Sequence, residues 1–198
     1  MEIDIDVSRE RILDVAEKHF RRIGYQKTSV ADIASSLGMS TANIYRFFPS
    51  RAVINRSICG RFLAETVQCA ESISRMRAPA QEKLANLLIC LHQNRKTTFI
   101  QEKTVHDLIV VATEENWAIA RTHGDEIAAI IEMIVSEGIE AGALGVEDAA
   151  QAALNVMNAF TPFYHPVLVE QQVRNGEDTE TGLRDQIHFF LKALGGGA

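Results

Sequence analysis

Residues 29–48 read SVADIASSLGMSTANIYRFF, and this segment carries the strongest structural signal in the chain. Ser29, followed by Asp32 three residues later, is typical of a capping box at the start of a helix. Gly38 is suited to end that helix, and Ser40 is suited to cap the next one. Two short helices joined by a glycine-containing turn predict a helix-turn-helix.

One further helix on each side completes this unit. Between Ser8, taken as a cap, and Ile23, apolar residues recur at every third or fourth position, as on the buried face of a helix. Ser50 is suited to cap a long helix at about residues 50–75. We therefore predict a helix-turn-helix domain over residues 1–51 and a second domain over residues 52–198, joined through this long helix.

The outward face of the predicted helix after Ser40 carries no carboxylate. Like the cap Ser40, the side chains on this face are small or able to form hydrogen bonds: Thr41, Ala42, Asn43, Tyr45 and Arg46. Such a face can approach phosphates and base edges without electrostatic repulsion. Arg51 lies in the first turn of the following helix beside free backbone amides, which predicts a phosphate contact. The segment indicates binding to double-stranded DNA, with a helical hairpin that binds no nucleic acid as the alternative.

Charge is distributed unevenly along the 198 residues, whose formal net charge is −6. Between Ser8 and Arg61 there are ten basic and four acidic residues, whereas from Phe62 to the end there are ten basic and nineteen acidic residues. A basic head on an acidic body is expected when one end of a protein meets a polyanion. Chance segregation of surface charge is the alternative to this interpretation.

Composition and patterning exclude several classes of protein. Only four prolines and twelve glycines interrupt the helix-forming residues, so we predict an all-α fold of about nine helices. The longest apolar runs are about five residues, far below the roughly 18 that a membrane span needs, and the amino end is acidic rather than signal-like. We expect a cytoplasmic protein without membrane contact.

The sequence carries no recognisable catalytic or cofactor motif. It contains no Gly-x-Ser-x-Gly, no phosphate-binding glycine loop and no pair of histidines four residues apart. Cys59, Cys69 and Cys90 fit no zinc-binding spacing, and we expect them to be reduced and buried. We therefore predict neither an enzyme nor a metal or cofactor site.

Several parts of the amino-terminal segment match one known pattern together: Gly24 to Ala34, Leu37 to Phe48, and Ser50 with Arg51. Over residues 8–56 the chain resembles the DNA-binding signature of TetR-family (TetR/AcrR) transcriptional regulators. This resemblance implies an all-helical, homodimeric repressor that binds a palindromic operator in the major groove. It also implies a larger carboxyl-terminal domain that dimerises and binds a small effector, which releases the DNA.

The resemblance further implies roles for individual residues. Ser29 would help to hold a phosphate at a helix start. The positions that would face the major groove are Thr41, Ala42 and Asn43, and those that would touch the DNA backbone are Tyr45, Phe47 and Arg51. Arg51 stands where the family usually has Lys, which keeps the charge. Phe47 stands where Tyr or His is commoner, which removes one phosphate hydrogen bond.

The acidic body reads as a series of helices. One opens at Pro79, and others are predicted at about residues 101–115, 118–141, 148–161 and 181–194. Between the last two, Pro162, Pro166 and an acidic stretch to Gly182 predict an irregular connection of roughly twenty residues. The glycine tail from Gly195 is expected to fray.

The alanine-rich helix that starts near Asp148 and the last helix together predict a dimer surface. The residues expected in it are Ala149, Ala152, Ala153, Val156 and Phe160 from the first, and Ile187, Phe190 and Leu191 from the second. The resemblance points the same way, because members of the family usually join through their last two long helices. The alternative is that these faces form internal core, since periodicity does not distinguish a partner within the chain from one in a second copy.

The helices between residues 79 and 140 are expected to enclose a pocket for a small apolar or amphipathic effector. The predicted pocket residues are Leu88, His92, His106, Ile109, Trp117, Phe160, Phe163 and Tyr164. A satisfied structural histidine is the alternative for each of the two histidines. A helical ligand carrier or protein-interaction module without specific DNA binding is the rival to the whole interpretation, and it would show no salt-sensitive affinity for duplex DNA.

Overall fold

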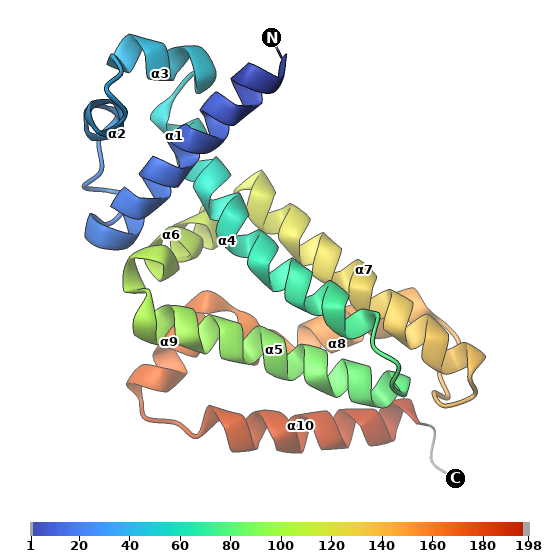
Figure 1. Cartoon of the computed structure of the whole chain (residues 1–198). Coiled ribbons are helices and arrows are strands. Elements are labelled where there is room, and N and C mark those ends of the chain that lie inside the picture. The colour runs from blue at the N-terminus through green and yellow to red at the C-terminus, as the bar shows by residue number, and fades with distance from the viewer. Residues whose placement is uncertain (1, 196–198) are drawn as a thin grey trace.

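In the computed structural model of this chain, residues 2–195 are described, with side chains from Asp6 onward (Figure 1). These residues form ten α-helices and no strand. The helices are α1 (Glu2–Ile23), α2 (Val30–Leu37), α3 (Thr41–Phe47), α4 (Arg51–Ser74), α5 (Ala80–Gln101), α6 (Lys103–Glu114), α7 (Ala118–Glu140), α8 (Ala149–Tyr164), α9 (Pro166–Arg174) and α10 (Thr179–Leu194). The predicted all-α fold is confirmed, with one helix more than expected. No helix in the described range is long and apolar enough to cross a membrane.

Helices α1, α2 and α3 pack together as the predicted helix-turn-helix unit, here called the head. Ser29 Oγ accepts a hydrogen bond from the Asp32 backbone N–H at 3.1 Å, and Asp32 Oδ2 accepts one from the Ser29 backbone N–H at 2.9 Å, which forms the capping box. Gly38 ends α2 in the left-handed region, with φ of 66°, where glycine has no Cβ to clash. The expected cap at Ser8 is wrong. α1 begins at Glu2, because no glycine or proline precedes Ser8 to stop the helix.

Two hydrophobic clusters form the core, and α4 contributes to both. The first joins the head to α4 and α6, and its fully buried members include Ile12, Ile44, Phe48, Ile58 and Leu108. The second lies in the body, here defined as α4–α10, and includes Leu87, Ile131, Ile134, Val156 and Phe160. The head is therefore packed onto the body rather than tethered to it. The predicted domain boundary at residues 51 and 52 remains a prediction.

In Figure 1, α4 leaves the head and runs beside α7 toward the far end of the body, while α5 runs back toward the head. α6 lies beneath α1 and packs against it, and its residues Val105, Leu108 and Ile109 are buried in the first cluster. This arrangement places the body directly against the helix that carries the head.

The body departs from the prediction between α7 and α10. α8 continues through Pro162 to Tyr164, and Pro166 begins α9 at a position where a helix needs no backbone N–H. α10 begins at Thr179, because Asp178 accepts a hydrogen bond from the Thr181 backbone N–H at 3.1 Å and caps the helix. The expected irregular connection is thus mostly helical. The expected fraying of the tail concerns residues 196–198, which lie outside the described residues.

The cysteines also differ from expectation. Cys69 of α4 and Cys90 of α5 form a disulfide, whereas all three cysteines were predicted to be reduced. The packing of α4 on α5 brings them together, and their separation of 21 residues carried no sign of it. Cys59 is free and fully buried, as predicted, and burial raises the pKa of its thiol to about 12.

Candidate nucleic-acid interface and internal cavity

The outer side of α3 carries the residues predicted to face the major groove. Ile44 is fully buried beneath the helix and thereby sets which side faces outward. The side chains of Thr41, Ala42, Tyr45 and Arg46 are exposed, and that of Asn43 is half-buried. Ser40 caps the helix, its Oγ accepting a hydrogen bond from the Asn43 backbone N–H at 3.2 Å. We call these outward residues, 41–43, 45 and 46, the α3 face.

Arg51 is exposed, but part of its guanidinium is already engaged. Its Nη2 donates to the backbone carbonyl of Tyr25 at 2.5 Å and to that of Gln26 at 2.8 Å. Arg51 therefore ties the start of α4 to the turn between α1 and α2. Its Nε and Nη1 have no hydrogen bond to a described residue, so the expected phosphate contact remains a prediction for these two atoms.

Ser29 and Phe47 are also tied into the head. Ser29 Oγ donates to Asp32 Oδ2 at 2.6 Å, within the capping box. Phe47 packs against the first core cluster, and its carbonyl accepts a hydrogen bond from Arg9 Nη1 at 2.5 Å. The Arg9 guanidinium lies 4.4 Å from the centre of the buried Phe48 ring. This packing neither shows nor excludes the DNA contacts predicted for Ser29 and Phe47, which remain predictions.

Apart from Arg9 and Arg51, the basic side chains between Ser8 and Arg61 fall into two groups. Arg21 of α1 and Arg61 of α4 form ion pairs across the junction between α1 and the helices that follow the head. The other group is exposed and forms no ion pair within the described part of the chain: Arg11, Lys18, Arg22, Lys27, Arg46 and Arg56. These charges are available to phosphates. Lys27, which precedes α2, is a candidate phosphate contact that the sequence analysis counted only as part of the overall charge.

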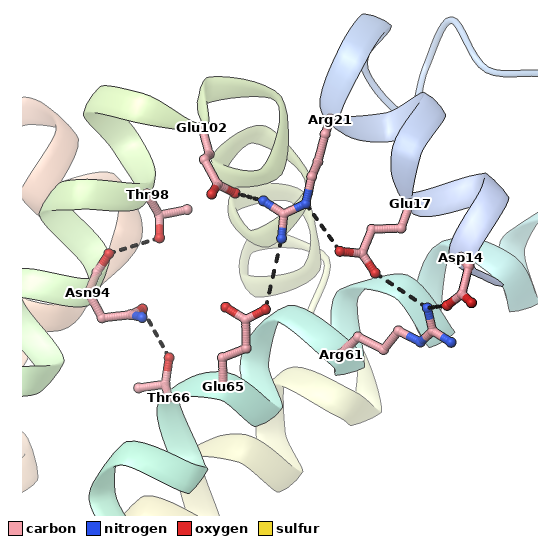
Figure 2. Close-up of polar contacts among 9 residues, drawn as sticks. All are labelled: Asp14, Glu17, Arg21, Arg61, Glu65, Thr66, Asn94, Thr98 and Glu102. Carbon is pink, nitrogen blue, oxygen red and sulfur yellow. Dashed lines mark hydrogen bonds and ion pairs between the residues drawn. The ribbon is translucent and has the colours of Figure 1, made fainter. Parts of the chain in front are cut away.

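Figure 2 shows the polar contacts between head and body. Arg21 of α1 pairs with Glu102 at the α5–α6 junction, with Glu17 at 3.1 Å and with Glu65 of α4 at 3.8 Å. Arg61 of α4 reaches back to α1, pairing with Asp14 at 2.8 Å and Glu17 at 3.3 Å. The two arginines thus connect α1, α4 and the end of α5.

The same view shows a second polar link, between α4 and α5. Thr66 Oγ1 donates to Asn94 Oδ1 at 2.9 Å, and Thr98 Oγ1 donates to the Asn94 carbonyl at 2.8 Å. Thr66 follows Glu65 directly and also lines the cavity described next. The head contacts and the cavity therefore share one segment of α4.

The body contains a cavity of about 180 Å³ whose walls come from α4, α5, α6, α7, α8 and α9. Most of its wall is apolar, formed by Leu63, Leu91, Ile109, Ala120, Ile127 and Met157. Its polar side chains include Arg95, which is only 6% exposed, together with His123, Tyr164 and His165. Burial, aided by the charge of Arg95, lowers the pKa of His123 to about 4, so this ring is neutral at pH 7.

Of the eight predicted pocket residues, Ile109 and Tyr164 line this cavity. Neither predicted histidine lines the cavity: both ring nitrogens of His92 have a partner, and His106 has one at Nε2 but none at its buried Nδ1. His92 Nδ1 lies 2.8 Å from the Phe163 carbonyl and its Nε2 lies 2.9 Å from Thr179 Oγ1, while His106 Nε2 lies 2.8 Å from Glu170 Oε2. Helix packing thus supplies each ring with at least one partner inside the protein, and a role of either histidine in effector binding remains a prediction.

The other predicted pocket residues belong to the core or its edge. Leu88 and Phe160 are buried in the second cluster, and Phe163 packs against that cluster, 6.0 Å from the His92 ring. Trp117 packs against the first cluster, and its Nε1 donates to Glu115 Oε2 at 2.8 Å. None of these four lines the cavity, because each large apolar side chain is used in packing.

Three polar residues of the cavity, Arg95, His123 and His165, were not predicted, although the sequence carries a signal for two of them. Arg95 lies four residues after Leu91 and so continues the apolar stripe of α5. His123 lies four residues before Ile127 and continues the stripe of α7 in the same way. A charged or titratable residue on the inward side of a helix indicates a polar site inside the protein. His165 carried no such periodic signal, since it lies between α8 and α9.

The predicted dimer residues lie mostly inside the chain. Ala152, Ala153, Val156, Phe160 and Ile187 are buried in the second cluster, and Ala149, Phe190 and Leu191 pack against it. The five buried side chains pack against helices of the same chain, whereas a dimer contact through the partly buried Ala149, Phe190 and Leu191 remains a prediction. The outer sides of the same two helices carry large exposed apolar residues instead, Leu154 of α8 at 52% exposure and Phe189 of α10 at 73%.

Two family profiles match the sequence. Residues 12–56 match the profile of "Bacterial regulatory proteins, tetR family", and residues 80–182 match that of "Tetracyclin repressor-like, C-terminal domain". Among curated proteins, none matches the chain significantly in sequence.

Solved structures share the fold over nearly the whole chain. A TetR/AcrR-family regulator from Thermobifida fusca YX-ER1 is 21% identical, with a TM-score of 0.64, and the alignment covers 93% of this chain and 96% of that one. FadR from Bacillus subtilis, solved with stearoyl-CoA, is 19% identical, with a TM-score of 0.59 and coverage of 96% and 98%. RolR, solved with resorcinol, is 13% identical, with a TM-score of 0.61 and coverage of 98% and 91%.

The two profiles cover different parts of the molecule. One spans the helix-turn-helix, and the other spans more than half of the chain, within the body. The family consists of DNA-binding regulators and is not enzymatic. Sequence profile, helix order and the exposed α3 face agree, and the chain therefore belongs to the TetR family of bacterial transcriptional regulators.

Proposed function

We propose that this regulator is a repressor that binds a palindromic operator as a homodimer and releases it when a small effector occupies the cavity. The family is ligand-responsive, and two structures with the same fold, FadR and RolR, were solved with stearoyl-CoA and resorcinol respectively. The family assignment argues against the alternative hypothesis, a helical ligand carrier or protein-interaction module without specific DNA binding.

The observation that carries this proposal is the double role of α4. Leu63 and Thr66 of this helix line the cavity, while Ile54 and Ile58, one to three turns earlier, are fully buried in the cluster that holds the head. A ligand that shifts α4 therefore moves α3. In a dimer this changes the distance between the two α3 faces, which must match major grooves about 34 to 36 Å apart. Release requires that the ligand bind one separation more tightly than the other.

We assign the dimer contact to the outer sides of α8 and α10. Leu154 and Phe189 are the large apolar residues exposed there, and apolar side chains of this size are costly to leave in water. Joining copies through these helices leaves both heads free to reach DNA.

Selection of bound duplexes from a random pool tests the DNA-binding half of the proposal. We expect a palindrome with half-site centres about 10 base pairs, or a multiple of that distance, apart. Recovery of a single asymmetric half-site would contradict it.

Analytical ultracentrifugation tests the dimer. Leu154→Asp and Phe189→Asp should each raise the dimer dissociation constant at least about tenfold, since a charge in an apolar interface is left unpaired. Ile100→Asp is the matched control, because Ile100 of α5 is 57% exposed and lies outside the proposed contact. A monomeric wild-type protein, or equal effects in all three variants, would refute the assignment.

A further inference from the structure

Arg95 is a buried cation without a counter-ion. Its side chain lies in the cavity wall with 6% of the residue exposed, and its Nε donates to the Tyr164 carbonyl at 3.2 Å. It forms no ion pair with any residue in the described range, and Nη1 and Nη2 have no hydrogen bond there. Burial lowers the pKa of Arg95 to about 10, which still leaves it charged at neutral pH. A buried charge without a counter-ion lowers the stability of the folded protein unless an anion binds beside it.

The surroundings of Arg95 contain no group that supplies the missing negative charge. No carboxylate lines the cavity among the described residues. The Cys59 thiol lies close enough to interact with Arg95, but its raised pKa keeps it neutral. Two further polar atoms at the cavity, His123 Nδ1 and His165 Nδ1, are buried without a hydrogen-bond partner. The polar groups of the cavity therefore include a guanidinium and two ring nitrogens without a hydrogen-bond partner, beside Thr66, Thr113, Asn116, Arg121 and Tyr164.

The apolar part of the wall fits a hydrocarbon group of limited size. Leu63, Leu91, Ile109, Ile127 and Met157 present only carbon and sulfur. A volume of about 180 Å³ corresponds to about a dozen water positions, and hence to a molecule of about ten to fifteen non-hydrogen atoms.

We propose that the cavity binds a small monocarboxylic acid, whose carboxylate pairs with Arg95 and whose hydrocarbon part lies against the apolar wall. The inference rests on the proposed function, since it names the chemical class of the effector. The planar guanidinium can meet both carboxylate oxygens through two parallel N–H···O bonds. A neutral ligand of the same shape leaves Arg95 unpaired, and a cationic one is repelled by Arg95 and by Arg121 at the same cavity.

Isothermal titration calorimetry of the full-length protein without DNA tests this assignment. The probes are octanoate, octan-1-ol and octylamine, which share a hydrocarbon chain and differ in charge. We expect octanoate to bind at least about tenfold more tightly than octan-1-ol, and octylamine to bind most weakly. Equal affinity for the acid and the alcohol, tighter binding of the amine, or binding of none of the three would overturn the proposal.

Variants at two neighbouring positions of α5 locate the charge. Arg95→Gln should weaken octanoate binding at least about tenfold and change octan-1-ol binding less than about threefold. Lys96→Gln removes a cation one residue further along, where Lys96 pairs with Glu180 outside the cavity at 2.9 Å, and should change neither affinity more than about twofold. Undiminished octanoate binding in Arg95→Gln, or an equal loss in Lys96→Gln, would refute the role of Arg95. If Arg95→Gln does not fold, Arg95→Lys takes its place. We expect this variant to keep the positive charge and still to bind octanoate more tightly than octan-1-ol.

The readouts separate this inference from the proposed function. Operator selection without ligand tests DNA binding alone, and calorimetry without DNA tests the cavity alone. If the protein binds its operator but no octanoate, the result contradicts only the carboxylate site and leaves the proposed DNA binding intact. A protein that binds octanoate through Arg95 but keeps its operator at saturating octanoate supports the carboxylate site and contradicts release by effector.

Discussion

The α3 face and the cavity are built in opposite ways. The α3 face comes from one run of seven residues, held by one cap and one buried side chain, Ile44. The cavity draws its wall from six helices, with lining residues from Leu63 to Pro166. A surface made by one helix keeps its chemistry wherever that helix is placed, whereas a cavity exists only where separate helices meet. Substitutions at the two sites should therefore affect different activities unless they also disturb the core that joins them.

Phe48→Ala tests whether head and body are one folding unit. Phe48 is fully buried in the cluster that α4 and α6 share with the head, so its removal should lower the free energy of unfolding by about 3 to 5 kcal/mol. Denaturant titration should show one transition by far-UV circular dichroism and by fluorescence of Trp117, which packs against this cluster. Tyr45→Ala, at an exposed aromatic residue of α3, is the control and should change stability by less than about 0.5 kcal/mol. Two separate transitions would show that the head unfolds by itself.

Acid should destabilise the cavity region. The pKa of His123 is lowered from 6.5 to about 4, so below pH 6.5 the unfolded state binds a proton that the folded state does not. The resulting loss of stability develops between pH 6.5 and about 4 and reaches at most about 3 kcal/mol from this residue. In His123→Gln, the free energy of unfolding measured with urea should depend less on pH over this range. Some slope should remain, since burial also lowers the pKa of His92, His106 and His165. An unchanged pH profile in the variant would show that His123 protonates without cost.

Substitutions on the head should separate base recognition from phosphate contact. Asn43→Ala or Thr41→Ala should cost about 1 to 3 kcal/mol on the selected operator and relax preference at particular base pairs. Arg51→Ala should weaken binding to all sequences and reduce the salt slope by about one. Fluorescence anisotropy on selected and scrambled duplexes measures both, with Arg77→Ala, at an exposed residue between α4 and α5, as the control. Equal losses on both duplexes for all three head variants would mean that no base is read by these residues.

The ion pairs of Figure 2 should contribute least to stability. The side chains of Arg21 and Glu65 are 35% and 62% exposed, so solvent screens their attraction. A double-mutant cycle of Arg21→Gln and Glu65→Gln should give a coupling energy below about 1 kcal/mol in denaturant unfolding. A larger coupling energy would indicate that head and body are joined by these charges rather than by the shared core.

Local signals explain why the head was predictable. The caps at Ser29, Ser40 and Ser50 and the stop at Gly38 act within one turn of the chain, so the structure reproduces them. The prediction failed at Ser8 and around Pro162, where a favourable cap or an unfavourable proline was outweighed by the residues on either side. Propensity is a weak prior that packing routinely overrides.

The cavity was not predictable in the same way. Periodicity showed which side of α5 and α7 faces inward, but it did not show that Arg95 and His123 share one space. The same holds for Val156 and Phe160 of the predicted dimer surface: periodicity shows that they face a packing partner, and only the structure shows that this partner lies within the same chain.

Sequence alone established an all-helical regulator with a basic helix-turn-helix and an outward α3 face free of carboxylates, because helix caps, glycine stops and charge act over a few neighbouring residues. Tertiary structure alone decided where the cavity lies, that Arg95 is buried in it without a counter-ion, and which sides of α8 and α10 remain exposed. These features depend on contacts between residues far apart in the chain, and such contacts leave no pattern at any fixed spacing.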